Sequence, residues 1–453
     1  MRASIRAPHP DPRGRVHHCV VLLTGVWLTA CPPAASEPTT GSTGTGAATS
    51  TDSGGPVSPT EAPTGTSTGA TATTASSACP DGTLDAEEDC DDGNAINGDG
   101  CNNDCRASAV QLAEYRSDER GSSQVYSVAA DADGSVVVGG RANGLERWVA
   151  RFGPELAPQW TQVYGEGAPG LVRGLDLGED AIYVAGARLS DADGQDMWVA
   201  RLGADGALEW EDTFSGGMGD DWLTQAVAVD GDVVVTGIAL ADRIWTRRYG
   251  PDGAVKWTAT EPLGITTKML YPLGPGLAAA GEGLVIGWSA YGAMDLYPEL
   301  LLMYSFGGGD PTSIVELPDT SGVINAIAAD PGGDLVLAVA ADFTALTVRR
   351  VTGADEVLWS RKDCSGSNGR DVAIDGQGDI VVIGDGPGDI GRNIRLCKFA
   401  ADGTLRWGKD IDGGFGDDLG YAVAIDPADR VVAGGAMNDG QGGFAAWLAI
   451  FAP

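Results

Sequence analysis

The sequence predicts an all-β fold, a seven-bladed β-propeller, on three observations. An apolar run that ends in a small residue recurs roughly every 50 residues over most of the chain. Each run is accompanied by three further short apolar segments with turn residues between them, and four strands per unit of this size are typical of a propeller blade. The last unit lacks its fourth strand, and a strand-like segment precedes the first unit, which predicts a closed ring.

The N-terminal residues predict an export signal. Arginines precede the apolar run 20–27, which is far shorter than the roughly 20 residues that span a bilayer. The small-residue segment Leu28–Cys31 follows and resembles a bacterial lipobox. The resemblance implies removal of 1–30, lipidation of Cys31 and, with Pro32 next, an outer-membrane or cell-surface location through the lipid anchor alone. The alternative is an ordinary signal peptide in which Cys31 has no role.

Residues 31–78 consist almost entirely of Ser, Thr, Gly, Ala and Pro. Such a composition cannot bury enough apolar surface to offset the entropy lost on ordering. We expect a disordered tether that holds the following domains away from the membrane.

Residues 79–106 form a cysteine-rich module. Four cysteines in this short stretch of an exported chain predict two disulfides, with three pairings open: Cys79, Cys90, Cys101 and Cys105. The blocks Cys90–Asn94 and Gly98–Cys101, followed by Cys105, resemble the myxobacterial-type cysteine-rich repeat. Pro80 and Glu87 depart from that pattern.

The same module carries oxygen-bearing side chains in a glycine-rich loop, namely Asp91, Asp92, Asn94, Asn97 and Asp99. Calcium prefers six to eight such oxygens, so calcium is the one cofactor that the sequence suggests. The alternative is that these residues make turns through side-chain-to-backbone hydrogen bonds.

Residues 109–453 form the propeller. Seven runs mark the blades by their final residues, which are Gly140, Gly186, Gly237, Gly287, Val339, Gly384 and Gly435. Residues 447–451 are expected as the last third strand and 110–116 as its missing partner. Asp-Gly pairs between third and fourth strands predict type I′ turns. Blade 4, residues 265–322, is the least regular, so six or eight blades remain open.

This region resembles the SBBP-type propeller repeats of bacterial surface lipoproteins. The resemblance lies in Trp198–Leu202, Ala204–Gly206, Trp210 and the run 226–230 that leads to Gly237. It implies the fold and no known activity.

The recurring tryptophans and cations are interpreted as structural. Residues that recur once per unit must lie in a ring, which suits packing between blades better than one binding pocket. The tryptophans fall on predicted third strands (Trp148, Trp198, Trp245, Trp447) and fourth strands (Trp160, Trp210, Trp257, Trp359, Trp407). The cations, three residues after the third-strand position, are expected to pair with recurring acids: Arg151, Arg201, Arg248, Arg350 and Lys398.

Two further features lie within the propeller. The glycine-rich loops 216–221 and 413–418 each end in two aspartates, which suits either calcium or ordinary turns. Cys364 and Cys397 are predicted to form a disulfide between adjacent blades, since an exported chain is expected to meet an oxidising compartment. The alternative is two free thiols.

The composition argues against several classes of function. All three histidines lie in 1–30, so the exported chain lacks the histidine that Ser-His-Asp catalysis and His-ligated metals require. A net charge of −34 excludes nucleic acid as a partner. We expect a monomer that is a non-catalytic binding or scaffold module for protein or glycan. The alternatives are a lyase or glycosidase with two carboxylates about 5–10 Å apart, a quinone-dependent dehydrogenase, and a calcium-stabilised structural surface protein.

Overall fold

The structure is a computed structural model, and it describes residues 79–453 except 86–87, 119–121, 166–167, 191–193, 217–220, 240–242, 263–274, 282, 290–298, 319, 321, 342–344, 354–355 and 367. The predicted signal peptide 1–30, the lipidation site Cys31 and the tether 31–78 therefore lie outside the described residues. Among the described residues, no helix is long and apolar enough to cross a membrane.

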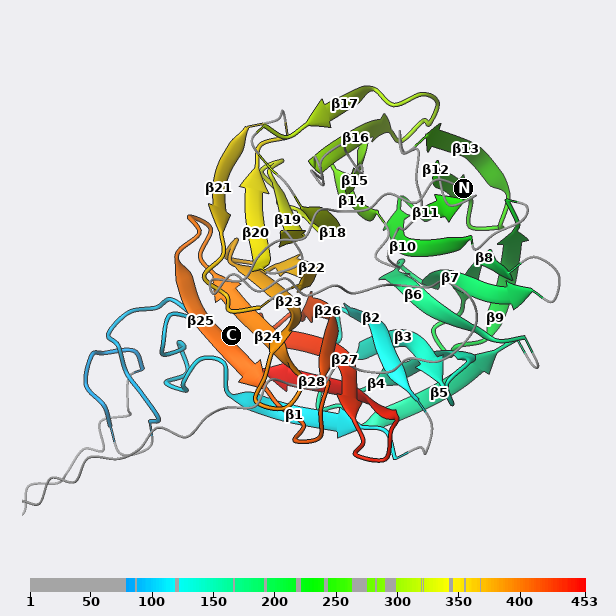
Figure 1. Ribbon diagram of the computed structural model, residues 1–453. Helices are drawn as coiled ribbons and strands as arrows, with labels where there is room; N and C mark the ends of the chain where they lie inside the picture. The colour runs from blue at the N-terminus through cyan, green and yellow to red at the C-terminus, as the bar shows by residue number, and fades with distance from the viewer. Residues whose placement is uncertain are drawn as a thin grey trace, which may run out of the picture. The chain divides into compact units, whose positions relative to one another are not determined.

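The described residues form seven antiparallel four-stranded sheets around one axis, a seven-bladed β-propeller (Figure 1). From the innermost strand outward, blades 1 to 3 are β2 (Gln124–Ala130), β3 (Val136–Ala142), β4 (Glu146–Phe152), β5 (Pro158–Tyr164); β6 (Gly170–Leu177), β7 (Ile182–Ser190), β8 (Gly194–Leu202), β9 (Leu208–Phe214); and β10 (Trp222–Val229), β11 (Asp232–Ala239), β12 (Arg243–Tyr249), β13 (Val255–Pro262).

Blades 4 to 7 follow the same order. They are β14 (Gly276–Ala280), β15 (Gly283–Ser289), β16 (Glu299–Ser305), β17 (Ser313–Glu316); β18 (Val323–Ala329), β19 (Leu335–Ala341), β20 (Ala345–Val351), β21 (Val357–Arg361); β22 (Asn368–Ile374), β23 (Ile380–Pro387), β24 (Arg392–Phe399), β25 (Leu405–Ile411); and β26 (Leu419–Ile425), β27 (Val431–Asn438), β28 (Phe444–Phe451), β1 (Gln111–Arg116).

The ring closes by pairing the two ends of the propeller. β1 lies antiparallel to β28, with Gln111 opposite Phe451 and Arg116 opposite Trp447. The predicted closure and the count of seven blades are confirmed, because blade 4 also has four strands despite its irregular sequence. Pairing the ends removes the open sheet edges that would otherwise template association.

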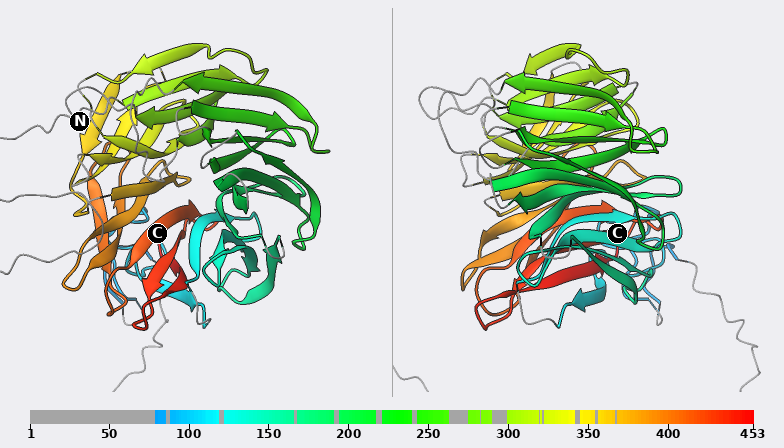
Figure 2. Two further views of the ribbon diagram at one scale, coloured as in Figure 1. Left: turned by 45° about the vertical axis from the view of Figure 1, so that its right-hand side comes forward. Right: turned by 90° about the vertical axis from the view of Figure 1, so that its right-hand side faces the viewer.

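Figure 2 shows the blades of the ring side by side. Apolar packing lies between the blades rather than inside them. Each of seven buried clusters draws its side chains from two adjacent blades, so every blade depends on both neighbours. The second and third strands are almost continuously buried, which is why their sequences read as apolar runs without alternation.

The outer tryptophans join each blade to the next. Their indole Nε1 groups donate to backbone carbonyls in the hairpin turn of the following blade: Trp160 to Ala204 (3.1 Å), Trp210 to Pro251 (2.9 Å), Trp257 to Phe306 (3.1 Å) and Trp359 to Ala401 (3.1 Å). The structural interpretation of the tryptophan repeat is therefore confirmed at these four positions.

The turn that receives each tryptophan is not the predicted type I′ turn. In Gly203–Ala207 only Gly206 has a positive φ, +80°, whereas type I′ would also require one at Asp205. The Gly206 N–H donates to the Gly203 carbonyl (2.9 Å), and the register shifts beside Leu202. The loop is thus a tight turn that ends in a left-handed glycine. The Asp205 carboxylate accepts the Ala207 N–H (3.0 Å), which closes the turn.

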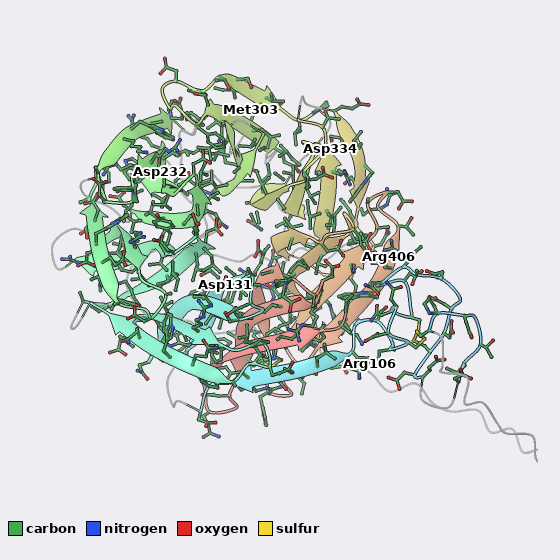
Figure 3. The ribbon with its side chains drawn as sticks, turned by 180° about the vertical axis from the view of Figure 1, so that it is seen from behind. Arg106, Asp131, Asp232, Met303, Asp334 and Arg406 are labelled. Atoms are coloured by element: carbon green, nitrogen blue, oxygen red, sulfur yellow. A yellow bond between two sulfur atoms is a disulfide. The ribbon has the colours of Figure 1, made fainter. Side chains whose placement is uncertain are left out.

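The recurring cations pair with acids from the same blade. Three of them pair with the recurring acid that follows the first strand, as the sequence predicted, namely Arg151, Arg350 and Lys398. Arg151 lies 2.6 Å from Asp131, Arg248 2.5 Å from Asp232, and Arg350 2.5 Å from Asp330. Arg201 pairs with Asp180 (2.9 Å), and Lys398 pairs with Asp375 (2.9 Å). Two of these acids, Asp131 and Asp232, are labelled in Figure 3, as is Asp334, a second partner of Arg350. The partly exposed pairs, such as Arg201 with Asp180, contribute little each to stability. Lys398 and Asp375 are fully buried, so removal of either partner would leave an uncompensated buried charge.

Candidate functional site

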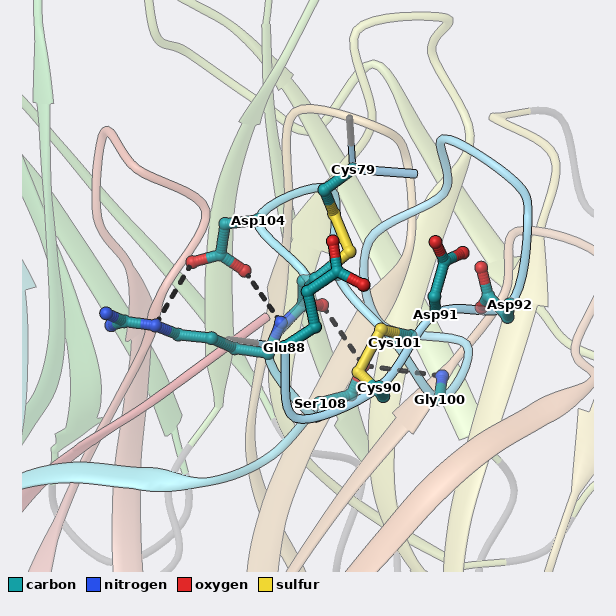
Figure 4. Close-up of a disulfide and its surroundings, with 12 residues drawn as sticks. Cys79, Glu88, Cys90, Asp91, Asp92, Gly100, Cys101, Asp104 and Ser108 are labelled. Atoms are coloured by element: carbon teal, nitrogen blue, oxygen red, sulfur yellow. Dashed lines mark hydrogen bonds and ion pairs between the residues drawn. A yellow bond between two sulfur atoms is a disulfide. The ribbon is translucent and has the colours of Figure 1, made fainter. Parts of the chain in front are cut away.

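The cysteine-rich module contains two disulfides, Cys79–Cys105 and Cys90–Cys101 (Figure 4). This is one of the three pairings that the sequence left open. The bonds hold a segment with almost no regular secondary structure, apart from a single bridge between Cys101 and Ala107.

The five predicted calcium ligands all accept hydrogen bonds inside the module. The Asp91 carboxylate accepts the N–H groups of Asp81, Gly82, Thr83 and Gly93, between 2.8 and 3.3 Å, and these bonds lower its pKa. The other four accept one bond each: Asp92 from Asn94 N (3.2 Å), Asn94 from Ile96 N (2.8 Å), Asn97 from Asn103 N (2.8 Å) and Asp99 from Asn94 Nδ2 (3.2 Å). This arrangement favours the turn alternative over a calcium shell.

Among the described residues, one group of three Cys, Asp or Glu side chains has its candidate ligand atoms close together, namely Cys79, Glu88 and Cys105. Its two cysteines are joined in a disulfide, so neither offers the thiolate that binds metal.

The module packs on blade 6 of the propeller. Gly98 lies over the Lys398 ammonium so closely that a Cβ at Gly98 would stand 2.6 Å from Nζ. Lys398 is the one lysine in the cation series, and its side chain is fully buried. A cleft of about 490 Å³ also separates the module from the propeller, with Asn97, Arg106, Glu155 and Arg430 in its wall.

The two glycine-rich loops place their last aspartates in structural roles. Asp221 accepts the Gly216 N–H (2.5 Å), and residues 217–220 lie outside the described part. Asp418, fully buried, accepts the N–H groups of Gly413 and Asn438. Both bonds close the connection into the first strand of the next blade, which favours the turn alternative for these loops as well.

The predicted pair Cys364 and Cys397 forms a disulfide between blades 5 and 6. Both sulfurs lie in the apolar cluster between these blades, and both residues are buried.

The most distinctive polar chemistry lies on the innermost strands, at a position the sequence analysis did not single out. In six of the seven blades the pairing of first and second strands shifts by one residue at the same place. One residue per blade is thereby bulged, and we call the six the axial ring: Tyr126, Arg173, Thr224, Asn325, Arg370 and Tyr421. Bulges re-aim side chains and are common beside functional sites.

Blade 4 contributes no bulged residue to the axial ring, because β14 pairs with β15 without a shift. The described part of this blade, which the sequence predicted to be the least regular, receives a hydrogen bond from its neighbour. The Thr224 hydroxyl donates to the Pro275 carbonyl (3.0 Å). Asn325 likewise donates to the carbonyl of Gly369, the residue before Arg370.

Four ring residues from consecutive blades form what we call the Arg–Tyr stack. Arg370 of blade 6 lies over Tyr421 of blade 7, with its guanidinium carbon 4.8 Å from the ring centroid. Tyr421 meets Tyr126 of blade 1 edge to face at 4.9 Å. Arg173 of blade 2 lies over Tyr126 at 5.5 Å. Cation–π contacts of this kind contribute about 0.5–2 kcal/mol each.

The pKa values of the stack residues reflect their burial and the closeness of several positive charges. Burial lowers the pKa of the Arg173 guanidinium, and the like charges of Arg370 and Arg141 lower it further. Burial also raises the pKa of Tyr126, and it raises that of Tyr421 to about 12, so both phenols stay neutral donors. Arg370 is balanced by the buried Asp385, whose Oδ1 lies 2.6 Å from Nε.

Two carboxyls beside the ring have raised pKa values. Desolvation by the surrounding protein raises the pKa of Asp176 to about 6 and that of Asp371 to about 7. Each accepts an N–H from the innermost strand of the next blade, Asp176 from Ala228 (2.8 Å) and Asp371 from Val423 (2.9 Å). Asp176 belongs to blade 2 and Asp371 to blade 6, and each connects its own innermost strand to the next one. This geometry favours a structural role for each carboxyl over a catalytic pair.

A signal for the axial ring was present in the sequence. The bulged residue stands shortly before the apolar end of each first strand, as in Val125–Ser127 or Gly420–Ala422. Aligning the units would show a column that reads Tyr, Arg, Thr, Asn, Arg and Tyr, while the residue before it is always small or apolar. The variation within that column distinguishes it from the tryptophan repeat.

Comparison with known proteins supports the fold alone. No family model matches the chain, and no curated protein does. The WD40 β-propeller domain of Doa1 is similar in structure, with a TM-score of 0.50 and 13% identity over 75% of this chain and 96% of that domain. A protein of unknown function from Bacteroides caccae matches with a TM-score of 0.41 and 12% identity, over 61% of this chain and 93% of that one.

Proposed function

We propose that this protein is a non-catalytic binding module that recognises a protein or glycan at the axial ring of its propeller. The observation that carries the proposal is the Arg–Tyr stack, in which four consecutive blades place Arg370, Tyr421, Tyr126 and Arg173 side by side. Repeating residues maintain the fold, whereas the ring differs from blade to blade. Function in a repeat architecture belongs to such sites.

The stack also has the composition of a recognition surface. Tyrosine offers a large contact area with few rotatable bonds. Arginine offers several directional hydrogen bonds, and both residue types are enriched in binding hot spots. All four side chains remain partly exposed. Side chains held by stacking are preorganised, which reduces the entropy lost when a ligand binds.

A binding screen tests this function. The purified protein is applied to a glycan array and used as bait for extracellular proteins, in parallel with Tyr126→Ala/Tyr421→Ala. We expect a ligand that the wild type retains and the double variant loses. Leu358→Ala, an exposed position on outer strand β21, is the control. A screen without ligands, or ligands retained equally by the double variant, would contradict the proposal.

We further propose that the propeller is displayed at the cell surface as a lipoprotein. The lipobox-like Leu28–Cys31 and the composition of 31–78 support this, together with the resemblance to SBBP-type and myxobacterial-type cysteine-rich repeats. In cells fed radiolabelled palmitate, the wild type and Cys19→Ser should take up label and Cys31→Ser should not. Equal labelling of Cys31→Ser would refute the anchor.

A further inference from the structure

The cleft of about 490 Å³ between the cysteine-rich module and the propeller is separate from the axial ring, because no ring residue lies in its wall. The module contributes three asparagines to the wall, Asn97, Asn102 and Asn103. The propeller contributes turns of blades 1 and 7, at Glu155 and Ala428, and the C-terminal residues. Clefts of roughly 300–1,000 Å³ are typical of sites for small molecules.

Both sides of the cleft are held by cross-links. On the module side, the segment 102–104 lies between Cys101 and Cys105, which belong to different disulfides (Figure 4). On the propeller side, the Arg430 guanidinium of blade 7 donates to the Pro154 carbonyl of blade 1 (3.2 Å). The Ala452 N–H donates to the Val110 carbonyl (2.8 Å). A cleft with walls fixed in this way is preorganised, which reduces the entropy lost on binding.

The charged groups of the wall favour a neutral ligand. Arg430 lies 2.6 Å from Asp426 and 3.4 Å from Glu155. Arg106 lies 3.9 Å from Asp104, and both side chains are well exposed. Each arginine of the wall therefore has an acid beside it, and the net charge of −34 opposes the approach of an anion.

The buried amide of Asn102 points to a ligand with oxygen acceptors. Asn102 borders the cleft and is only 4% exposed. Its Oδ1 accepts the Gly98 N–H (2.9 Å) and the Ser108 hydroxyl (3.0 Å), which fixes the side chain. Its Nδ2 donates to none of the described residues. Buried donors are costly to leave without an acceptor, and a molecule in the cleft would supply one.

The rest of the wall suits a saccharide. An asparagine amide both donates and accepts, as sugar hydroxyls do, and Asn97 and Asn103 add two amides to that of Asn102. Leu112, Ala452 and Pro453 supply aliphatic surface for the C–H groups of a sugar ring. Extended peptides are commonly held along a sheet edge, whereas all residues of this wall except Leu112 lie outside the strands.

We propose that the cleft between the cysteine-rich module and blades 7 and 1 binds a neutral saccharide of one or two sugar residues, with Asn102 Nδ2 donating to one of its oxygens. The site goes beyond the proposed function, because it shares no residue with the axial ring. It also gives the module a role, which is to hold the asparagines against the propeller.

The test is a titration followed by ligand-observed NMR, with maltose, cellobiose, lactose and chitobiose at millimolar concentration as probes. The protein is the wild type or Tyr126→Ala/Tyr421→Ala, which changes the axial ring and keeps the cleft. We expect at least one of these disaccharides to bind both proteins with the same affinity.

Matched variants locate the interaction. Asn102→Asp keeps an oxygen for Gly98 and Ser108 and replaces the Nδ2 donor, so it should weaken binding by about tenfold or more. Ala428→Trp, at an exposed turn position, fills the cleft and should abolish binding. Its control is Gln377→Trp, at the same turn position of blade 6 and outside the wall, which should bind as the wild type does. Thermal unfolding shows that each variant keeps the fold.

The outcomes distinguish the cleft from the axial ring. Failure of all four probes to bind, or binding unchanged in both Asn102→Asp and Ala428→Trp, would overturn the cleft and leave the proposed function standing. A disaccharide lost only in Tyr126→Ala/Tyr421→Ala would belong to the ring and would also overturn the cleft. A disaccharide that this double variant retains and Ala428→Trp loses would support the cleft, even if no ligand of the ring is found.

Discussion

At the residue scale, the turn glycine explains why the segment 198–210, WVARLGADGALEW, has related copies in other blades, such as WTRRYGPDGAVKW at 245–257. Gly206 has φ +80°, and a Cβ there would stand 2.8 Å from the Trp160 ring of the preceding blade. Gly253 and Gly403 hold the same relation to Trp210 and Trp359. The motif therefore encodes a contact between blades, in which one blade supplies the tryptophan and the next supplies the bare backbone on which it lies.

Gly206→Ala should destabilise the protein more than Gly231→Ala. Both glycines have nearly the same φ, +80° and +79°, but a Cβ at Gly231 would meet nothing within 4 Å. We expect Gly231→Ala to cost about 1–2 kcal/mol of unfolding free energy from backbone strain alone. Gly206→Ala should cost about 1–3 kcal/mol more, because the indole must move. Equal losses in urea unfolding would show that the tryptophan contact adds nothing.

Asp371 should make the protein less stable as the pH rises from about 4 to about 7. Its pKa is about 7 in the folded state and about 3.9 when unfolded, so the folded state binds the proton more tightly over this window. Stability is greatest while Asp371 is protonated, and it falls as the unfolded carboxyl ionises first. In Asp371→Asn this loss should be smaller, as measured by urea unfolding at a series of pH values.

Asp439→Asn is the control of opposite sign. Backbone N–H groups of Gln441 and Gly443 lower the pKa of Asp439, so its contribution is present above the unfolded pKa and is lost as the pH falls through the folded one. Asp439→Asn should therefore lack this contribution at neutral pH, and its stability should converge on that of the wild type below about pH 4. An Asp371→Asn profile parallel to that of the wild type would contradict the assignment.

At the element scale, stability depends on contacts between successive blades. The Cys364–Cys397 disulfide closes a loop of 33 residues in sequence and lies in the apolar cluster between blades 5 and 6. Other blades are joined by hydrogen bonds from the outer tryptophans. Asp176 and Asp371 also join neighbouring blades, because each accepts an N–H from the innermost strand of the next blade.

Cys364→Ala/Cys397→Ala should lower the unfolding free energy by roughly 3–4 kcal/mol, since a loop of this length then regains its freedom in the unfolded chain. Cys90→Ala/Cys101→Ala removes a bond within the module and should leave the propeller transition nearly unchanged. Urea unfolding followed by tryptophan fluorescence distinguishes the two, because all tryptophans after residue 31 lie in the propeller. A loss below about 1 kcal/mol in the first variant would contradict the role of this bond.

Chelation of divalent ions should leave the melting temperature unchanged. Asp91 and its neighbours already accept backbone N–H groups throughout the module, and a calcium ion would have to displace those bonds. Thermal unfolding with and without EDTA measures this directly. A clear drop with EDTA, reversed by added calcium, would establish the calcium-stabilised alternative.

At the scale of the whole molecule, periodicity made the propeller predictable. Burial of second and third strands produces apolar runs such as 136–140, and the extra segment 110–116 indicated the closing pair with β28. The turn type was mistaken because an Asp-Gly pair also fits a longer loop with one left-handed glycine. Packing of Gly98 on Lys398 joins segments 300 residues apart, which no local pattern records.

The candidate site was harder to predict from the sequence than the fold was. A bulge leaves no residue-type signature of its own, so Tyr126 and Arg173 read as ordinary strand residues. Their proximity depends on blades 7, 1 and 2 meeting at the axis, and that follows only from closure of the ring. Blade 4 has the least regular sequence, yet the varying residues that lie together in space come from one column of the innermost strands of other blades.

Hydrogen–deuterium exchange in the presence and absence of the ligand found by the screen tests the central claim most directly. The claim is that the protein binds at the axial ring. Binding there should slow exchange in β2, β6, β22 and β26, the strands that carry the Arg–Tyr stack, and leave outer strands such as β9 and β25 unchanged. Protection confined to the outer strands, or to the module at 79–106, would contradict it.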